Sequence, residues 1–208
     1  MIDRVAAYLD KNHYEEHLKM HQVPETYLKP QYNLAKGQFA TIVRMQAGRL
    51  QLERVQWGSQ LGSQSFDPAD READQKTVAK VERAVFPING FFIWNDDRED
   101  TQPFYIKRID GRPLYVPSLI KTESTGDRHF EILERDANIL ILPLTKQMPR
   151  AVHEDNIKDW LDMSLSEKEA LEHSEMELGL TELTVHKVSG AVNDLARNEE
   201  GLLHPLPK

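Results

Sequence analysis

Residues 84–94 have the sequence A-V-F-P-I-N-G-F-F-I-W, in which Pro87 and Gly90 interrupt two short apolar runs. Each run has the length and the β-branched and aromatic content of a buried strand, so we predict strands at 84–86 and 90–94. Ile93 stands between an aromatic pair and Trp94. This position raises the question of whether Ile93 only packs in a core or occupies a place where a catalytic group would be expected.

Similar segments recur on both sides of this stretch. We predict a hairpin from two alternating runs, 39–45 and 50–57, joined by a turn at Ala47-Gly48. Further strands are expected at 104–108, 114–119, 129–133 and 183–188, with a hairpin turn at Asp110-Gly111 before the second of these. Helical spacing predicts helices at 3–21, near 75–82, from 157 and over 164–173. The closing residues L-L-H-P-L-P are expected to pack rather than hang free.

Many short strands with a few flanking helices indicate an α+β fold with a mostly antiparallel, barrel-like β core. The length of 208 residues favours one domain over residues 1–208. With 39% hydrophobic and 29% charged residues, the chain is typical of a globular protein. No apolar run approaches the roughly 18 residues of a membrane span, and the start M-I-D-R-V lacks the layout of a secretory signal, so we expect a cytoplasmic protein.

The composition also excludes some chemistry. The chain has no cysteine, which removes disulfides, thiolate metal sites and cysteine nucleophiles. The formal net charge of −8 repels nucleic acid at long range, so any such binding requires a local basic patch.

Two clusters invite a metal-binding interpretation. His13, His17 and His21 share one stripe of the predicted helix, but H-Y-E-E-H is not the H-E-x-x-H motif, so we expect an exposed polar face. The acidic residues of 96–100 lack the spacing of a calcium loop and are expected at a solvated hairpin tip. No glycine-rich phosphate loop or nucleophile elbow is present, and we predict neither a metal nor a cofactor.

Several motifs in one order resemble the SRAP family (SOS response-associated peptidase), whose members shield abasic sites in single-stranded DNA. The matching segments are 31–38 (Q-Y-N-L-A-K-G-Q), Trp57-Gly58, 84–94, 102–106 (Q-P-F-Y-I), 110–113 (D-G-R-P), Ala137-Asn138, Met148-Pro149, Trp160-Leu161 and Val188-Ser189 with Val192-Asn193. The resemblance extends from end to end, and it implies a SRAP-like fold.

The positions that carry chemistry in this family differ. The resemblance implies a Cys, an Asn-Ala-Arg triplet, an acid/base Glu and an active-site His. This chain has Ile2, Glu72-Ala73-Asp74, Ile93 and Thr145 at those places, with Gln147 and Ser63 replacing an Arg and a stacking Trp. Ile93 cannot carry a proton. We therefore expect a catalytically degenerate homologue rather than an enzyme.

Three functions remain open from the sequence. The first is non-covalent binding of single-stranded or abasic DNA through the family positions Arg4, Asn33, Trp57, Lys146, Met148 and Pro149, with Lys36 and Arg150 as further cations. The alternative interpretation of these cations and of Trp57 is ordinary surface charge and core packing. The second function is a protein-interaction module with no DNA role. The third is weak lyase action through a reversible imine on the Met1 α-amine.

Overall fold

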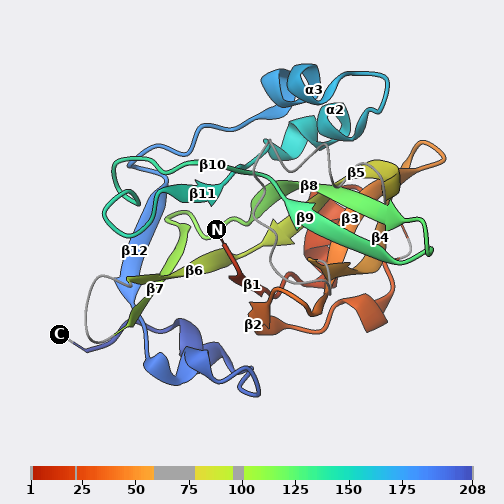
Figure 1. Cartoon of the computed structure of the whole chain (residues 1–208). Helices are drawn as coiled ribbons and strands as arrows, with labels where there is room; N and C mark the ends of the chain where they lie inside the picture. Colours follow the sequence, from red (N-terminus) through yellow and green to blue (C-terminus); the bar gives the residue numbers. More distant parts are fainter. Residues whose placement is uncertain (1, 22, 59–77, 96–100, 208) are drawn as a thin grey trace.

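A computed structural model describes residues 2–21, 23–58, 78–95 and 101–207, and two β assemblies dominate it (Figure 1). One is a closed five-stranded barrel. Its strands, in spatial order, are β3 (Phe39–Gln46), β4 (Arg49–Trp57), β9 (Arg128–Ile132), β8 (Leu114–Glu123) and β5 (Val78–Ile88). All neighbours pair antiparallel except β4 and β9, which are parallel. The predicted α+β class with a barrel-like, mostly antiparallel core is confirmed.

The second assembly is an antiparallel five-stranded sheet beside the barrel (Figure 1). Its strands, in spatial order, are β12 (Leu183–Lys187), β7 (Gln102–Arg108), β6 (Gly90–Asn95), β1 (Arg4–Ala7) and β2 (Gln31–Ala35). A separate two-stranded ribbon joins β10 (Glu134–Asp136) to β11 (Gln147–Pro149). The strands predicted at 90–94, 104–108 and 183–188 all lie in the large sheet.

The stretch 84–94 carries the chain from the barrel into the sheet. Strand β5 ends at Ile88, and β6 begins two residues later in the other assembly. Asn89 makes the corner: its backbone N–H donates to the Ala6 carbonyl at 2.7 Å, and its side-chain oxygen accepts from the Tyr8 N–H at 2.8 Å. A Cβ on Gly90 would lie 2.5 Å from the Tyr105 ring and from the Ile106 carbonyl oxygen. Only glycine fits this close approach.

The predicted hairpin is confirmed. Eight residue pairs join β3 to β4, from Phe39 opposite Gln56 to Gln46 opposite Arg49. Ala47 and Gly48 form the turn, with φ of 49° and 73°. Positive φ at both central residues is the conformation that matches the twist of the flanking strands.

The helix predicted at 3–21 is wrong. Residues 4–7 form β1, which pairs with both β2 and β6, and helical conformation in this range is restricted to residues 11–17, of which His13–His17 are a π-helical turn labelled η1. Backbone pairing to two neighbouring strands outweighs the weak preference expressed by the helical spacing. A second short turn, η2 (Glu25–Tyr27), leads into β2.

Two further predictions need correction. Residues 78–82, predicted as part of a helix near 75–82, belong to the long strand β5, which pairs there with β8. Asp110-Gly111 is not a hairpin turn, because β7 and β8 belong to different assemblies. It is a corner between them, and the Arg108 guanidinium holds it by donating to both Asp110 carboxylate oxygens at 2.9 and 2.5 Å.

The two predicted C-terminal helices are confirmed as α2 (Ile157–Leu161), which follows a short turn η3 (Glu154–Asn156), and α3 (Glu167–Ser174). Trp160 is fully buried against the barrel, and its indole N–H donates to the Ala84 carbonyl at 2.7 Å. Arg83 on β5 donates to the carbonyls of Trp160, Asp162 and Leu165 at 3.3, 2.7 and 2.6 Å. The first two bonds satisfy carbonyls at the end of α2, and the third holds the loop between α2 and α3.

The C-terminal segment covers the β2 edge of the large sheet and contacts the carboxyl end of β12, where the Leu206 N–H donates to the Lys187 carbonyl at 3.0 Å. It contains two short turns, η4 (Gly190–Asn193) and η5 (Glu200–Leu203), and Leu202 and Leu203 are buried, as expected for a packed tail. The Asn198 side chain pairs with backbone groups at the β2 edge as a neighbouring strand would. It accepts from the Tyr32 N–H at 2.7 Å and donates to the Pro30 carbonyl at 3.0 Å. Covering sheet edges in this way prevents unwanted strand pairing.

No helix among the described residues has the length and apolar character needed to cross a membrane.

Gly90→Ala tests the close packing at the junction between the barrel and the sheet. We expect a loss of about 1–3 kcal/mol in the free energy of unfolding, because the added methyl overlaps the Tyr105 ring and a backbone oxygen. Gly201→Ala is the matched control, since its methyl meets nothing within 4 Å. Urea unfolding measures both, and a wild-type midpoint for Gly90→Ala would contradict the junction's packing.

Candidate functional site

The positions of the expected Cys and Glu lie together in the apolar core. Ile2, just before β1, is 2% exposed, and Ile93 on β6 is 5% exposed. Both belong to one buried cluster with Ile141 and Met148, which come from the β10–β11 region. The fold therefore places both of these sequence-predicted positions in the same core cluster, but the side chains at the two positions are apolar. No proton can be stored or transferred by these side chains.

Thr145 ends the turn that connects β10 to β11 beside this cluster. Its N–H donates to the Ile141 carbonyl at 3.1 Å, and its hydroxyl oxygen accepts from the Gln147 N–H at 3.5 Å. Asn138 shapes the start of the same turn, because its side-chain oxygen accepts from the N–H groups of Leu140 and Ile141. Thr145 thus serves local backbone structure, and its hydroxyl is not titratable in the range where an imidazole would be.

A carboxylate that sequence reasoning missed lies at the amino end of β1. The Ile2 backbone N–H donates to the Glu134 carboxylate at 2.5 Å. Glu134 opens the β10–β11 ribbon, so this bond fixes the start of the chain against that ribbon. The two residues are 132 positions apart. Nothing in the local sequence could have indicated the contact.

Arg4 is engaged inside the protein. Its Nη1 donates to the Asn33 side-chain oxygen and to the Val192 carbonyl, each at 2.8 Å. Its guanidinium lies over the Trp94 ring at 5.3 Å from the centroid, a cation–π arrangement. Burial lowers the pKa of Arg4, an effect that Asp3 partly offsets. A phosphate would have to compete with these existing partners.

Asn33 is buried, and its amide group holds the C-terminal segment. The side-chain N–H₂ donates to the carbonyls of Val192, Asp194 and Arg197 at 3.1, 3.0 and 3.1 Å. Its oxygen accepts from Arg4. The role that the structure gives to Asn33 is therefore to join β2 to η4.

Trp57 is fully buried in the barrel. Its ring stacks with Phe130 at 6.5 Å between centroids and meets Phe86 edge-on at 5.7 Å. A DNA base needs an exposed aromatic face, and Trp57 offers none. Of the two interpretations that the sequence left open for Trp57, core packing describes its place in this structure, because the residue is on the inward face of β4.

The remaining predicted contacts differ in exposure. Met148 is 1% exposed and Pro149 is also buried, whereas Lys146 is exposed at the end of the β10–β11 ribbon. The other cations considered are paired: Lys36 lies 3.1 Å from Glu131, and Arg150 lies 2.6 Å from Glu175. Among the six predicted contact residues, Lys146 alone presents an exposed charge.

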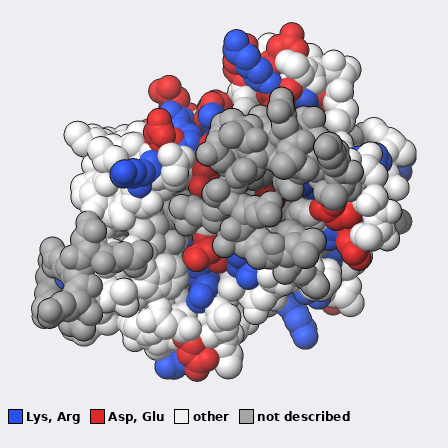
Figure 2. Space-filling model, in the orientation of Figure 1, with Lys and Arg blue, Asp and Glu red and all other residues white. Residues whose placement is uncertain are grey.

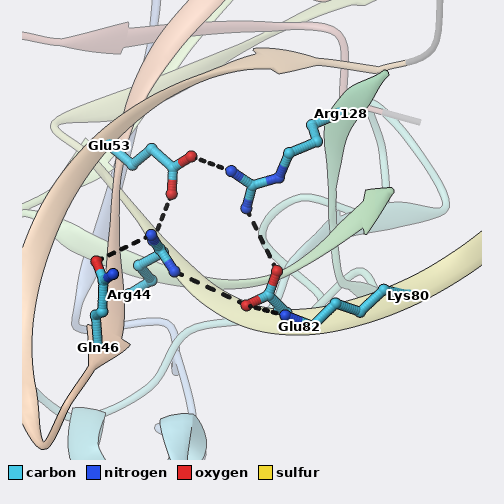
Figure 3. Close-up of polar contacts among 6 residues, drawn as sticks. All are labelled: Arg44, Gln46, Glu53, Lys80, Glu82 and Arg128. Atoms are coloured by element: carbon cyan, nitrogen blue, oxygen red, sulfur yellow. Dashed lines mark hydrogen bonds and ion pairs between the residues drawn. The ribbon is translucent and has the colours of Figure 1, made fainter. Parts of the chain in front are cut away.

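A closed ring of ion pairs crosses four barrel strands, and sequence reasoning did not find it (Figure 3). Arg44 on β3 pairs with Glu53 on β4 and, at 3.8 Å, with Glu82 on β5. Arg128 on β9 pairs with the same two carboxylates, the Glu82 contact being 3.4 Å. Lys80 approaches Glu82 at 3.1 Å. Each arginine is thus neutralised by two carboxylates, which reduces its attraction for a phosphate.

Charge on the visible face is mixed. Figure 2 shows Lys and Arg side chains scattered among Asp and Glu rather than gathered in one stripe. With the formal net charge of −8, this face offers no broad electrostatic attraction for a nucleic acid backbone among the residues that the structure describes.

The histidine stripe does not form a metal centre. His13 and His17 stack face to face at 4.7 Å between centroids, and His21 is exposed. Within the described ranges, no group of three or more His, Cys, Asp or Glu is arranged to hold a metal ion. Other predictions fall outside the described residues, namely those on Met1, Ser63, Glu72, Ala73, Asp74 and the acidic loop 96–100.

Comparisons with known proteins agree with this architecture. The chain is similar to the abasic site processing protein YedK of Escherichia coli (strain K12), at 24% identity over 187 residues that cover 84% of each chain. A solved protein structure from Bacteroides thetaiotaomicron superposes with a TM-score of 0.72 at 16% identity, over 98% of this chain and 99% of its own. A phage-related protein of Bordetella bronchiseptica gives a TM-score of 0.66 at 20% identity, over 89% and 93%.

A family model provides the assignment. The model described as "SOS response associated peptidase (SRAP)" matches residues 1–195, which is nearly the whole chain. The SRAP resemblance inferred from the ordered motifs is therefore confirmed. This protein belongs to the SRAP family.

Proposed function

We propose that this chain is a SRAP protein without covalent abasic-site chemistry, which contacts single-stranded or abasic DNA non-covalently. The observation that carries the proposal is the burial of Ile2 and Ile93 in one apolar cluster. Covalent capture needs a nucleophile and a proton carrier that reach the reacting atom, and these two side chains supply neither. The relationship to an abasic site processing protein supports a DNA-related role.

The proposed DNA contact is weak and centred on the β10–β11 ribbon. Lys146 supplies an exposed positive charge there. Arg4, Asn33 and Trp57 stabilise the fold that carries the ribbon and do not contact the DNA directly. A single phosphate contact makes a small, salt-dependent contribution to affinity.

A second function is favoured by a different observation. Ile139 and Leu142, on the turn that ends at Thr145, are 71% and 55% exposed. Exposed apolar side chains beside a filled site are more useful for contacting another protein than for contacting a phosphate backbone. The alternative is therefore a protein-interaction module on the SRAP fold.

Ile93→Glu tests whether the former acid/base position is closed. A carboxylate in this apolar cluster is removed from water, so we expect a loss of about 3–5 kcal/mol in the free energy of unfolding at neutral pH. Burial raises the pKa of such a carboxyl, so the folded state keeps a proton that the unfolded state releases. The loss should therefore grow as the pH rises above about 4.3.

Ile93→Gln is the matched control, because Gln is polar and has nearly the same size as Glu, but its side chain cannot titrate. It should lose stability without the pH dependence. Urea unfolding across the pH range distinguishes the two variants, and a well-tolerated Ile93→Glu with no pH dependence would mean that the site is open to water.

Binding of a fluorescent oligonucleotide tests the DNA contact, with intact single-stranded, abasic and duplex forms side by side. We expect weak binding to the single strands that falls as salt rises, and no adduct that survives denaturation. Lys146→Glu should weaken binding and reduce the salt dependence by about one phosphate contact. Lys168→Glu, an exposed lysine on α3, should leave both unchanged.

No binding even at low salt would remove the DNA role and leave the interaction module. A product trapped on abasic DNA by borohydride would instead support imine chemistry at the Met1 amine.

A further inference from the structure

Four polar side chains form a cluster that we call the histidine latch: His13, His17, Tyr115 and Glu154. They come from η1, β8 and η3. The His13 Nε2 lies 2.5 Å from the Tyr115 hydroxyl, and the His17 Nδ1 lies 3.1 Å from Glu154 Oε1. The Tyr115 hydroxyl lies 3.3 Å from Glu154 Oε2, and the two imidazoles stack at 4.7 Å. The latch thus closes a circuit that ties η1 to segments more than 100 residues away.

The latch fastens a segment that has little regular structure. Within residues 10–20 only 11–17 are helical, and η1 ends at His17. Beyond that end, the Met20 N–H donates to the Tyr14 carbonyl at 3.1 Å. Tyr14, Leu18 and Met20 are buried in the same apolar cluster as Tyr115 and Trp160. This segment also connects β1 to β2, two strands of the sheet that carries Ile93. Segments with few backbone hydrogen bonds are those that open first.

Residues 10–20 pack against the barrel, and we call this packing docking. Docking makes protonation of His13 unfavourable. Burial lowers its pKa, and the stacked His17 lowers it further, while Glu154 and Asp10 partly oppose them. Burial, followed by the Glu154 charge, raises the pKa of Tyr115, so this hydroxyl keeps its proton and remains able to donate. Two protonated imidazoles in a stack would repel each other. Other charged and titratable groups that act on the latch are Tyr14, Arg108 and Arg112.

We propose that the histidine latch is a pH-sensitive fastening, which releases residues 10–20 from the barrel on mild acidification while the barrel stays folded. Histidine is the side chain whose charge ordinarily changes between pH 5 and 8. The released segment takes up a proton near the usual histidine value of about 6.5, and the docked segment does so only at lower pH. Docking is therefore complete above that value and weakens as the pH falls below it. This device does not depend on the proposed DNA contact.

Hydrogen exchange of the full-length protein tests the proposal. After correction for the intrinsic pH dependence of exchange, amides of residues 13–20 should open up to about tenfold more for each pH unit below about 6.5, the limit for one titrating proton. Amides of β8 should keep their protection. Equal opening of residues 13–20 at all pH values would overturn the proposal.

Variants assign the effect to the latch. His13→Gln keeps a hydrogen-bonding group toward Tyr115 but cannot titrate, so its opening should lose the pH dependence. His204→Gln changes an exposed histidine near the C-terminus and should behave as the wild type. An unchanged pH dependence in His13→Gln would overturn the proposal.

A second measurement keeps the proposal testable if His13→Gln does not fold. Proton NMR of the wild-type imidazoles should show His13 titrating below the usual histidine value of about 6.5. A His13 midpoint at or above that value would refute a latch that opposes protonation.

Discussion

The close approach of Gly90 to the Tyr105 ring is the contact on which the architecture depends. It lets the backbone leave the barrel after Ile88 and enter the sheet at Gly90, with only Asn89 between the two assemblies. Because Asn89 bonds to both Ala6 and Tyr8, the same corner also positions β1. The barrel and the sheet therefore share one core, and Ile2 and Ile93 lie within it.

This shared core also contains the two positions at which the family resemblance implies a nucleophile and an acid/base group. Both positions are close to the strand junction, where buried apolar side chains add packing energy and unpaired charges cost it. Ile2 and Ile93 fit this environment because both side chains are apolar and buried. Packing at the junction therefore requires no titratable group at these two positions, since fold and activity are separable properties.

Local patterns were enough to predict part of this molecule. The Ala47-Gly48 turn with alternating flanks specifies a hairpin, because its backbone conformation and its register depend on neighbouring residues. The helix predicted over 164–173 followed from its helical spacing, and the structure adds that Ser166 and Glu169 cap it. The absence of cysteine and the apolar character of Ile2 and Ile93 were also visible in the sequence.

Tertiary structure decided the rest. Residues 4–7 became a strand because β2 and β6 lie on either side of them. Trp57 became core because barrel closure turned its strand face inward. The Ile2–Glu134 bond, the ion-pair ring and the histidine latch join residues tens to more than a hundred positions apart. Such contacts have no local pattern, since they depend on which surfaces the folded chain brings together.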